Sequence, residues 1–183
     1  MSTSTEQRAG FKHSETASSS RPKLSFVVFE LDKQAYGLPI AAVGEILPMA
    51  QLTRPPQAPM LLAGFLNLEG QPVPVIRLRR LFALDDEPAD IYTPLVLLRS
   101  NDRRLALLVD RVCRIISADE SCLVPVEDAC SLNNCAAGML DVAGAVVVVL
   151  SPDRLLLEQE NRQIDELTVM ERDRLSQLQG AAP

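Results

Sequence analysis

The chain has 183 residues, of which 47% are hydrophobic and 4% aromatic, and its formal net charge at pH 7 is −6. This length is enough for one domain of ordinary size or for two small ones that share an interface. The acidic balance argues against nucleic acid or an anionic membrane surface as the main partner. No stretch approaches the roughly 20 apolar residues that a membrane-spanning helix needs.

The first segment, residues 1–23, is rich in Ser and Thr and lacks the apolar run of a signal peptide. A segment of this composition cannot bury enough apolar surface to offset the entropy of ordering it. We therefore expect a disordered leader and a cytoplasmic protein.

Behind the leader, residues 24–82 return, degraded but in order, as residues 93–156. The first blocks align at an offset of 69 residues and the last block at an offset of 74. The best matched pairs are Leu38/Leu107, Val43/Val112, Ile46/Ile115, Gly64/Gly138, Gly70/Gly144, Val73/Val147 and Val75/Val149. Such self-similarity indicates two copies of one unit, and a groove between two copies favours binding over catalysis.

In the first copy, short β-like segments alternate with turn residues, as in small barrels or sandwiches. We expect strands over residues 26–31, 36–40, 43–47, 62–68 and 71–76, and a single helical turn over residues 77–82. The last two strands form a hairpin that turns at Glu69–Gly70, where glycine supplies a positive φ. Pro72 and Pro74 place the second arm at a sheet edge, or in extended backbone whose N–H groups are not needed. Residues 85–90 read as a solvated acidic linker.

The second copy repeats the plan, with strands expected over residues 95–99, 105–109, 112–116, 138–142 and 145–150. An acidic, turn-rich insertion fills residues 117–137. Ser151, Pro152 and Asp153 are typical of a helix start, which would carry Leu155 and Leu156 onto the β core. Farther on, Ile164, Leu167, Leu175 and Leu178 give a helical stripe interrupted by Glu171, so we expect a second, weaker helix. That helix is either docked or frayed, and binding to a partner is the alternative.

The sequence contains no recognisable arrangement of catalytic residues. The single histidine, His13, lies in the leader, and no Gly-rich phosphate loop is present. The four cysteines, Cys113, Cys122, Cys130 and Cys135, have irregular spacings that do not fit a zinc site. Glu45 and Asp110 stand alone in apolar surroundings, which is more typical of an ion pair or an interface than of a general acid. We therefore expect no enzyme, no metal and no cofactor.

Several segments together resemble a known family. They are residues 43–46, 54–59, 64–70 and 73–76 in the first copy, and residues 105–112 and 138–144 in the second. In this order and spacing, they resemble the signature run of the chemotaxis coupling proteins, the CheW-like domain family. The resemblance covers roughly residues 24–157.

The resemblance implies a mainly all-β fold of two packed, small, five-stranded β-barrels, in which one barrel can lend a strand to the other, with a C-terminal helix added. The implied domain organisation is a leader at residues 1–23, a CheW-like domain at residues 24–157 with repeat units of about 24–82 and 93–156, and a helical extension or tail at residues 158–183.

The resemblance also implies a non-catalytic adapter. Proteins of this family bind the cytoplasmic tip of chemoreceptors and the regulatory domain of a CheA-type histidine kinase, and other CheW-like domains are a further candidate partner. The alternative is a structural array protein that keeps the fold but has lost receptor or kinase binding. Neither reading includes nucleic acid or insertion into a membrane.

We expect an apolar groove that takes a receptor helix, lined by part of the strand around residues 38–46 and by the loop of residues 55–59. The partner-binding residues implied by the resemblance are Leu38, Ile40, Val43, Glu45, Ile46, Pro56, Pro59, Asn67, Leu68 and Glu69.

Two positions depart from the family pattern, since Glu69 stands where an arginine is usual and Arg77 where an aspartate is usual. We expect Arg77 to bridge Glu69, Glu45 or both, and the exchange to change which receptor or kinase is accepted. The alternative is neutral drift on a surface loop.

Overall fold

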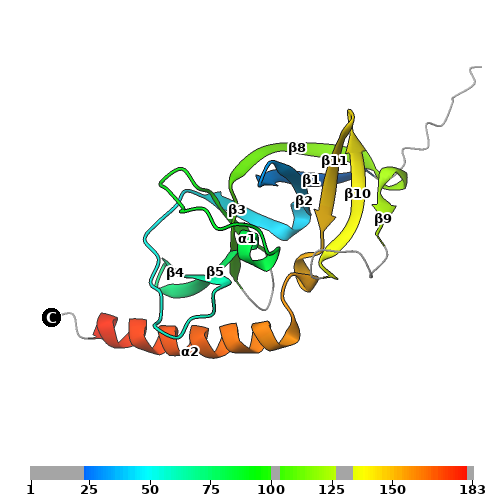
Figure 1. The fold of residues 1–183 in the computed structure, drawn as a ribbon. Coiled ribbons are helices and arrows are strands. Elements are labelled where there is room, and N and C mark those ends of the chain that lie inside the picture. Colours follow the sequence, from blue (N-terminus) through cyan, green and yellow to red (C-terminus); the bar gives the residue numbers. More distant parts are fainter. Residues whose placement is uncertain (1–22, 100–103, 127–133, 181–183) are drawn as a thin grey trace, which may run out of the picture.

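The structure is a computed structural model that describes residues 23–99, 104–126 and 134–180 (Figure 1). The strands within these ranges form a six-stranded sheet, in the order β8-β1-β2-β11-β10-β9, and a five-stranded sheet, in the order β3-β6-β7-β5-β4. The strands are β1 (Lys23–Leu31), β2 (Gln34–Pro39), β3 (Val43–Leu47), β4 (Leu62–Leu68), β5 (Gln71–Arg77), β6 (Leu95–Leu98), β7 (Leu105–Leu108), β8 (Arg111–Asp119), β9 (Val124–Pro125), β10 (Ala136–Val142) and β11 (Ala145–Leu150). Apart from Lys23, the expected leader lies outside the described residues.

Each sheet takes strands from both copies of the repeat. β3 leaves the first copy and pairs with β6, while β8 leaves the second copy and pairs with β1. Two parallel pairs, β2 with β11 and β5 with β7, complete the exchange. We call the sheets and their cores the six-stranded half and the five-stranded half.

The cores of the two halves are built from equivalent residues. Leu66, Val73 and Val75 are buried together in the five-stranded half. Their counterparts 74 positions later, Leu140, Val147 and Val149, are buried together in the six-stranded half. The internal repeat is therefore a repeat of packing as well as of sequence.

A third and larger core lies between the halves. It contains the repeat pairs Leu38/Leu107, Val27/Val96, Tyr36/Leu105 and Ile76/Leu150, so that both copies contribute equivalent side chains to it. Phe29 stacks on Tyr36, whose ring also meets Phe82, at centroid distances of 5.9 and 5.3 Å. We call this the shared core, and it makes the two halves one packed unit.

The expected turns at the paired glycines are present. Glu69 and Gly70 have φ of 54° and 82°, and Ala143 and Gly144 have the same two values, the pattern of a type I′ hairpin. In each turn the glycine N–H donates to the side-chain Oδ1 three residues earlier, Asn67 or Asp141, at 2.9 Å. The other glycine pair marks close approach, because a Cβ at Gly64 or Gly138 would lie 2.8 Å from a backbone oxygen of the neighbouring segment.

The expected mainly-β architecture of two small barrel-like halves with a C-terminal helix is confirmed. One half differs in strand number, because the insertion contributes the two-residue strand β9, which pairs with β10. β5 is an inner strand rather than an edge strand. Its two prolines are tolerated because pairing with β7 begins only at Val75, after both of them.

The C-terminal region forms one short 3₁₀ turn, Pro152–Arg154, and one continuous helix, α2 (Glu158–Gly180). Leu155, Leu156 and Ile164 are buried in the shared core, so the helix is docked. It runs along β4 and β5 (Figure 1). Glu171 lies on the buried side, and its carboxylate accepts from Arg174 at 3.2 Å. Within the described residues, no helix is long and apolar enough to span a membrane.

Candidate functional site: a charged hollow at the seam of the five-stranded half

The five-stranded sheet curls until its two edges approach each other. β3 and β4 are the outer strands of the sheet, yet residues from β3 and from the end of β4 line one hollow of about 340 Å³. The lining residues are Gly44, Glu45, Leu68, Glu69, Leu97, Leu98, Arg99 and Arg104. We call this the seam hollow.

Four charged side chains meet in the seam hollow. Glu45 and Glu69 come from the first copy, and both are exposed. The basic side chains, Arg99 and Arg104, come from the second copy, because the exchanged strand β3 pairs with β6. Among the described residues no ion pair joins any of these four side chains to another.

Arg77 does not bridge to Glu69 or Glu45, and the expected pairing is wrong. Its Nη1 lies 3.0 Å from Asp86 Oδ2, and Arg80 Nη2 approaches the same oxygen at 2.9 Å. The reason is the length of the hairpin. Gln71 sits beside the Glu69–Gly70 turn, whereas Arg77 follows Ile76 at the opposite end, and six residues of strand span about 20 Å.

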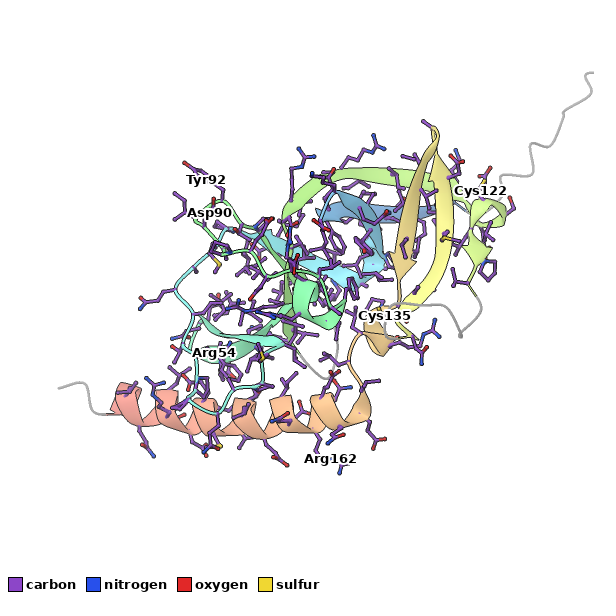
Figure 2. All side chains as sticks on the ribbon, in the orientation of Figure 1. Arg54, Asp90, Tyr92, Cys122, Cys135 and Arg162 are labelled. Atoms are coloured by element: carbon purple, nitrogen blue, oxygen red, sulfur yellow. The ribbon has the colours of Figure 1, made fainter. Side chains whose placement is uncertain are left out.

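The acidic linker is held by arginines instead of being fully solvated, which corrects a second expectation. Besides the contacts of Asp86, Arg79 Nη1 donates to the Asp85 carbonyl oxygen at 2.8 Å, and its Nη2 lies 3.1 Å from Glu87 Oε2. Beyond these contacts Tyr92 projects away from the body of the molecule (Figure 2).

Asp110 forms the ion pair that its isolation in the sequence indicates. Arg79, which is buried, donates to both carboxylate oxygens, from Nε at 2.8 Å and from Nη2 at 2.6 Å. The backbone N–H of Asp32 donates to the same carboxylate at 2.9 Å. Partial burial works to raise the pKa of Asp110, but the hydrogen bonds from Arg79 and Asp32 outweigh it and leave the pKa below its ordinary value. Asp110, which lies between β7 and β8 in the second copy, is thereby joined to Arg79 after β5 and to the β1–β2 turn of the first copy.

The residues expected to form one apolar groove are divided between the core and separate surfaces. Leu38 and Val43 are buried in the shared core, so they hold the fold together and are not accessible to a partner. Ile40 is exposed and lines an apolar groove of about 450 Å³ together with Leu24, Phe26 and Val149. Ile46 is 45% exposed on the outer strand β3.

The loop of residues 55–59, which we call the proline loop, lies on a different surface from Ile40 and Ile46. Arg54 fixes it by donating to the carbonyl oxygens of Leu62, Ala58 and Pro59, and Figure 2 places Arg54 beside the β4–β5 hairpin, on the side of α2. Pro56 is exposed and Pro59 half-buried. The structure therefore brings Glu45, Leu68 and Glu69 together in the seam hollow. The proline loop and Ile40 lie outside it. The side chain of Asn67 accepts the hydrogen bond from Gly70 that stabilises the hairpin turn.

The described cysteines do not form a metal site. Cys122 lies at the outer end of the six-stranded half and Cys135 near the middle of the molecule (Figure 2). Burial raises the pKa of the Cys135 thiol to about 11, which disfavours the thiolate that a metal requires. In the described ranges no group of three or more His, Cys, Asp or Glu side chains is arranged so that it could hold a metal ion, and Cys130 lies outside these ranges.

Comparison with known proteins gives a consistent result. Residues 25–160 match the family model described as CheW-like domain. The chain is 32% identical over 111 residues to the chemotaxis protein CheW of Helicobacter pylori, which covers 61% of this chain and 67% of that protein. It is 28% identical over 144 residues to CheW of Klebsiella aerogenes, covering 78% and 87%.

Among solved structures, the fold is similar to the crystal structure of the scaffolding protein TtCheW from Thermoanaerobacter tengcongensis. The TM-score is 0.67 at 24% identity, over 71% of this chain and 90% of that one. The family model spans most of the described strands, including both hairpins and the exchanged strands β3 and β8. The chain therefore belongs to the CheW-like domain family.

Proposed function

We propose that this chain is a non-catalytic adapter that couples chemoreceptors to a CheA-type histidine kinase in a signalling array. The observation that carries the proposal is the match of residues 25–160 to the CheW-like domain family. It is supported by relatives named as chemotaxis proteins and by a structural neighbour named as a scaffolding protein.

In this proposal the protein acts in the cytoplasm without a cofactor. Its partners are the cytoplasmic tip of a chemoreceptor and the regulatory domain of the kinase, with other CheW-like domains as a further candidate. Residues 24–157 are the coupling module, residues 1–23 a leader and residues 158–183 an extension. The packing of Ile164 in the shared core supports an extension that is seated on the module.

We place the receptor surface at the seam hollow and along the adjoining strand β3. Glu45 and Ile46 are consecutive residues of this outer strand, and both are exposed. An exposed isoleucine beside charged side chains supplies the mixed apolar and polar contacts that partner surfaces use. The charges of the seam hollow would then set which partner is accepted.

The test is Ile46→Asp, with Ile115→Asp as the matched control. Ile115 is the repeat counterpart of Ile46, lies on the equivalent exchanged strand β8, and is 62% exposed. In a pull-down with a purified receptor tip, Ile46→Asp is expected to lose at least tenfold in affinity, while Ile115→Asp binds as the wild type does. Equal effects of the two substitutions, with unchanged thermal midpoints, would place the receptor surface elsewhere.

A second candidate is a structural array protein that has lost one of its two partners. Glu69 favours it, because this position in the seam hollow carries the charge opposite to that of the usual family residue. Separate pull-downs with the receptor tip and with the kinase regulatory domain distinguish the two functions: an adapter binds both, and the structural protein fails with at least one.

A further inference from the structure

The outer faces of the two hairpins β4–β5 and β10–β11 are equivalent under the repeat. On the first face Thr53, Phe65 and Pro74 lie side by side across neighbouring strands. On the second, Val124, Met139 and Val148 lie side by side in the same arrangement. Phe65 and Pro74 precede Met139 and Val148 by 74 residues, the offset of the repeat.

The two faces differ in what covers them. α2 runs along β4 and β5, and Phe65, only 2% exposed, is buried in the shared core together with Ile164 of α2. No described helix covers the β10–β11 hairpin, which lies on the side of the molecule away from α2 (Figure 1). Met139 is 40% exposed, Val146 49% and Val124 59%. Three large apolar side chains are therefore exposed on this face, and one of them, Met139, is the counterpart of the buried Phe65.

We propose that the outer face of β10–β11, formed by Val124, Met139 and Val146 beside the half-buried Val148, is a docking site for an amphipathic helix of a partner protein. A helix of this chain, α2, is already seated on the equivalent face of β4–β5. α2 shows that a hairpin of this shape, twist and register accepts a helix across its strands.

The composition of the face defines the chemistry of this helix. α2 docks through Ile164 and Leu167, three residues apart, and both pack with the shared core. The partner helix likewise presents apolar side chains at spacings of three and four residues. Asp141 lies two residues from Met139 on the same side of β10, so a lysine or arginine beside the apolar stripe would meet an opposite charge.

The proposed function explains why a second surface would be useful, since an adapter needs more than one. The binding of a helix to this face does not otherwise depend on that function. The face lies in the six-stranded half, whereas the seam hollow belongs to the five-stranded half. A helix bound to β10–β11 would leave the seam hollow open to a second partner.

The probe is a synthetic peptide of residues 158–180 that carries Glu171→Leu, which gives α2 a continuous apolar stripe. Added to the full chain, the labelled peptide is expected to bind one to one, as measured by fluorescence anisotropy. The double substitution Met139→Asp and Val146→Asp is expected to weaken binding at least tenfold. Ile115→Asp is the control, because it changes another exposed apolar residue of the same half, on β8.

Methyl NMR locates the peptide. Shifts at Val124, Met139, Val146 and Val148 with unchanged signals of Ile164 and Leu167 support the proposal. No binding at peptide concentrations up to about 1 mM, binding that survives the double substitution with an unchanged thermal midpoint, or shifts centred on Ile164 would overturn it. None of these results depends on a receptor or a kinase, so failure here is distinct from failure of the proposed function.

Discussion

At the scale of single residues, arginines at and just after the end of β5 pair with the acidic linker of residues 85–90. The resemblance implies an acid at the position of Arg77, and the arginine is accommodated by Asp86, not by the opposite departure at Glu69. Arg80 shares the same carboxylate. The two departures from the family pattern therefore have separate structural consequences, one at the linker and one in the seam hollow.

A double-mutant cycle separates these consequences. Arg77→Ala and Asp86→Ala are expected to couple by about 0.2–1 kcal/mol in the free energy of unfolding, because the pair is partly exposed. Arg77→Ala and Glu69→Ala should be additive, since the two residues lie at opposite ends of the hairpin. Urea unfolding measures both cycles. Coupling between Arg77 and Glu69 alone, with none between Arg77 and Asp86, would support the Arg77–Glu69 pairing expected from the sequence.

The Arg79–Asp110 pair should matter more, because one partner is buried. Asp110→Asn is expected to lower the free energy of unfolding at pH 7 by about 1–3 kcal/mol. The pKa of Asp110 is depressed in the folded state, so this contribution is complete above the ordinary value of 3.8 and is lost as the pH falls through the folded-state pKa.

Unfolding of the wild type and of Asp110→Asn over a pH series measures this dependence. The difference between the two proteins is expected to shrink at acid pH. Glu45→Gln is the control, since it removes an exposed charge and should change stability by less than about 0.5 kcal/mol. A difference that stays constant down to the lowest pH would contradict the ion-pair account.

The role of a residue could be predicted from the sequence where that role depends on its immediate neighbours in the chain. The positive φ at Gly70 follows from the Glu69–Gly70 turn itself. The apolar neighbours of Asp110 indicate an ion pair or an interface, and Asp110 forms an ion pair. The partner of Arg77 could not be found in this way, because Asp86 is brought to it by the path of the linker after α1 (Leu78–Leu81). Arg99 and Arg104 were missed for the same reason, since a strand exchange places them beside Glu45.

At the level of elements, the glycine pairs of the hairpins serve two different purposes. Gly70 and Gly144 provide positive φ in the turns, whereas Gly64 and Gly138 permit close approach of a neighbouring strand. The matching roles in the two copies explain why these glycines remain in step along the sequence.

Gly64→Ala and Gly144→Ala should therefore differ in cost. A Cβ at Gly64 would lie 2.8 Å from the Thr53 carbonyl oxygen, with φ at 152°, so a loss of about 2–4 kcal/mol is expected. At Gly144 no atom lies within 4 Å, and only the φ of 82° opposes a side chain, at about 1 kcal/mol. Equal losses in thermal or urea unfolding would show that close approach at Gly64 is not the limiting factor.

Strand positions were predictable because alternating and apolar runs bounded by turn residues report them directly. Strand partners were not, since the pattern of a strand does not say which sheet it joins. Leu38 and Val43 were therefore interpreted as groove residues, although their side chains face the shared core. The β9 strand was missed because two residues carry too little pattern.

For the whole molecule, the strand exchange and the shared core make the two copies interdependent. β1 and β2 need β8 and β11, and β6 and β7 need β3 and β5. The shared core takes equivalent residues from both copies. Neither copy can complete a sheet or bury its apolar face alone.

We therefore expect the full chain to unfold in one cooperative transition. Residues 24–82 and 93–156, produced as separate fragments, should each lack the fixed near-ultraviolet circular dichroism of a packed protein and regain it when mixed. A fragment that folds alone, with a transition of its own, would contradict the shared-core account.

The central claim is that this molecule joins two partners at once, and a three-component sedimentation assay tests it most directly. Kinase is mixed with receptor-tip assemblies, and the kinase that co-sediments is measured with and without the chain. The account predicts that the wild type and Ile115→Asp raise the sedimented kinase several-fold, whereas Ile46→Asp does not. An amount of sedimented kinase that is independent of the wild-type chain would contradict the coupling function.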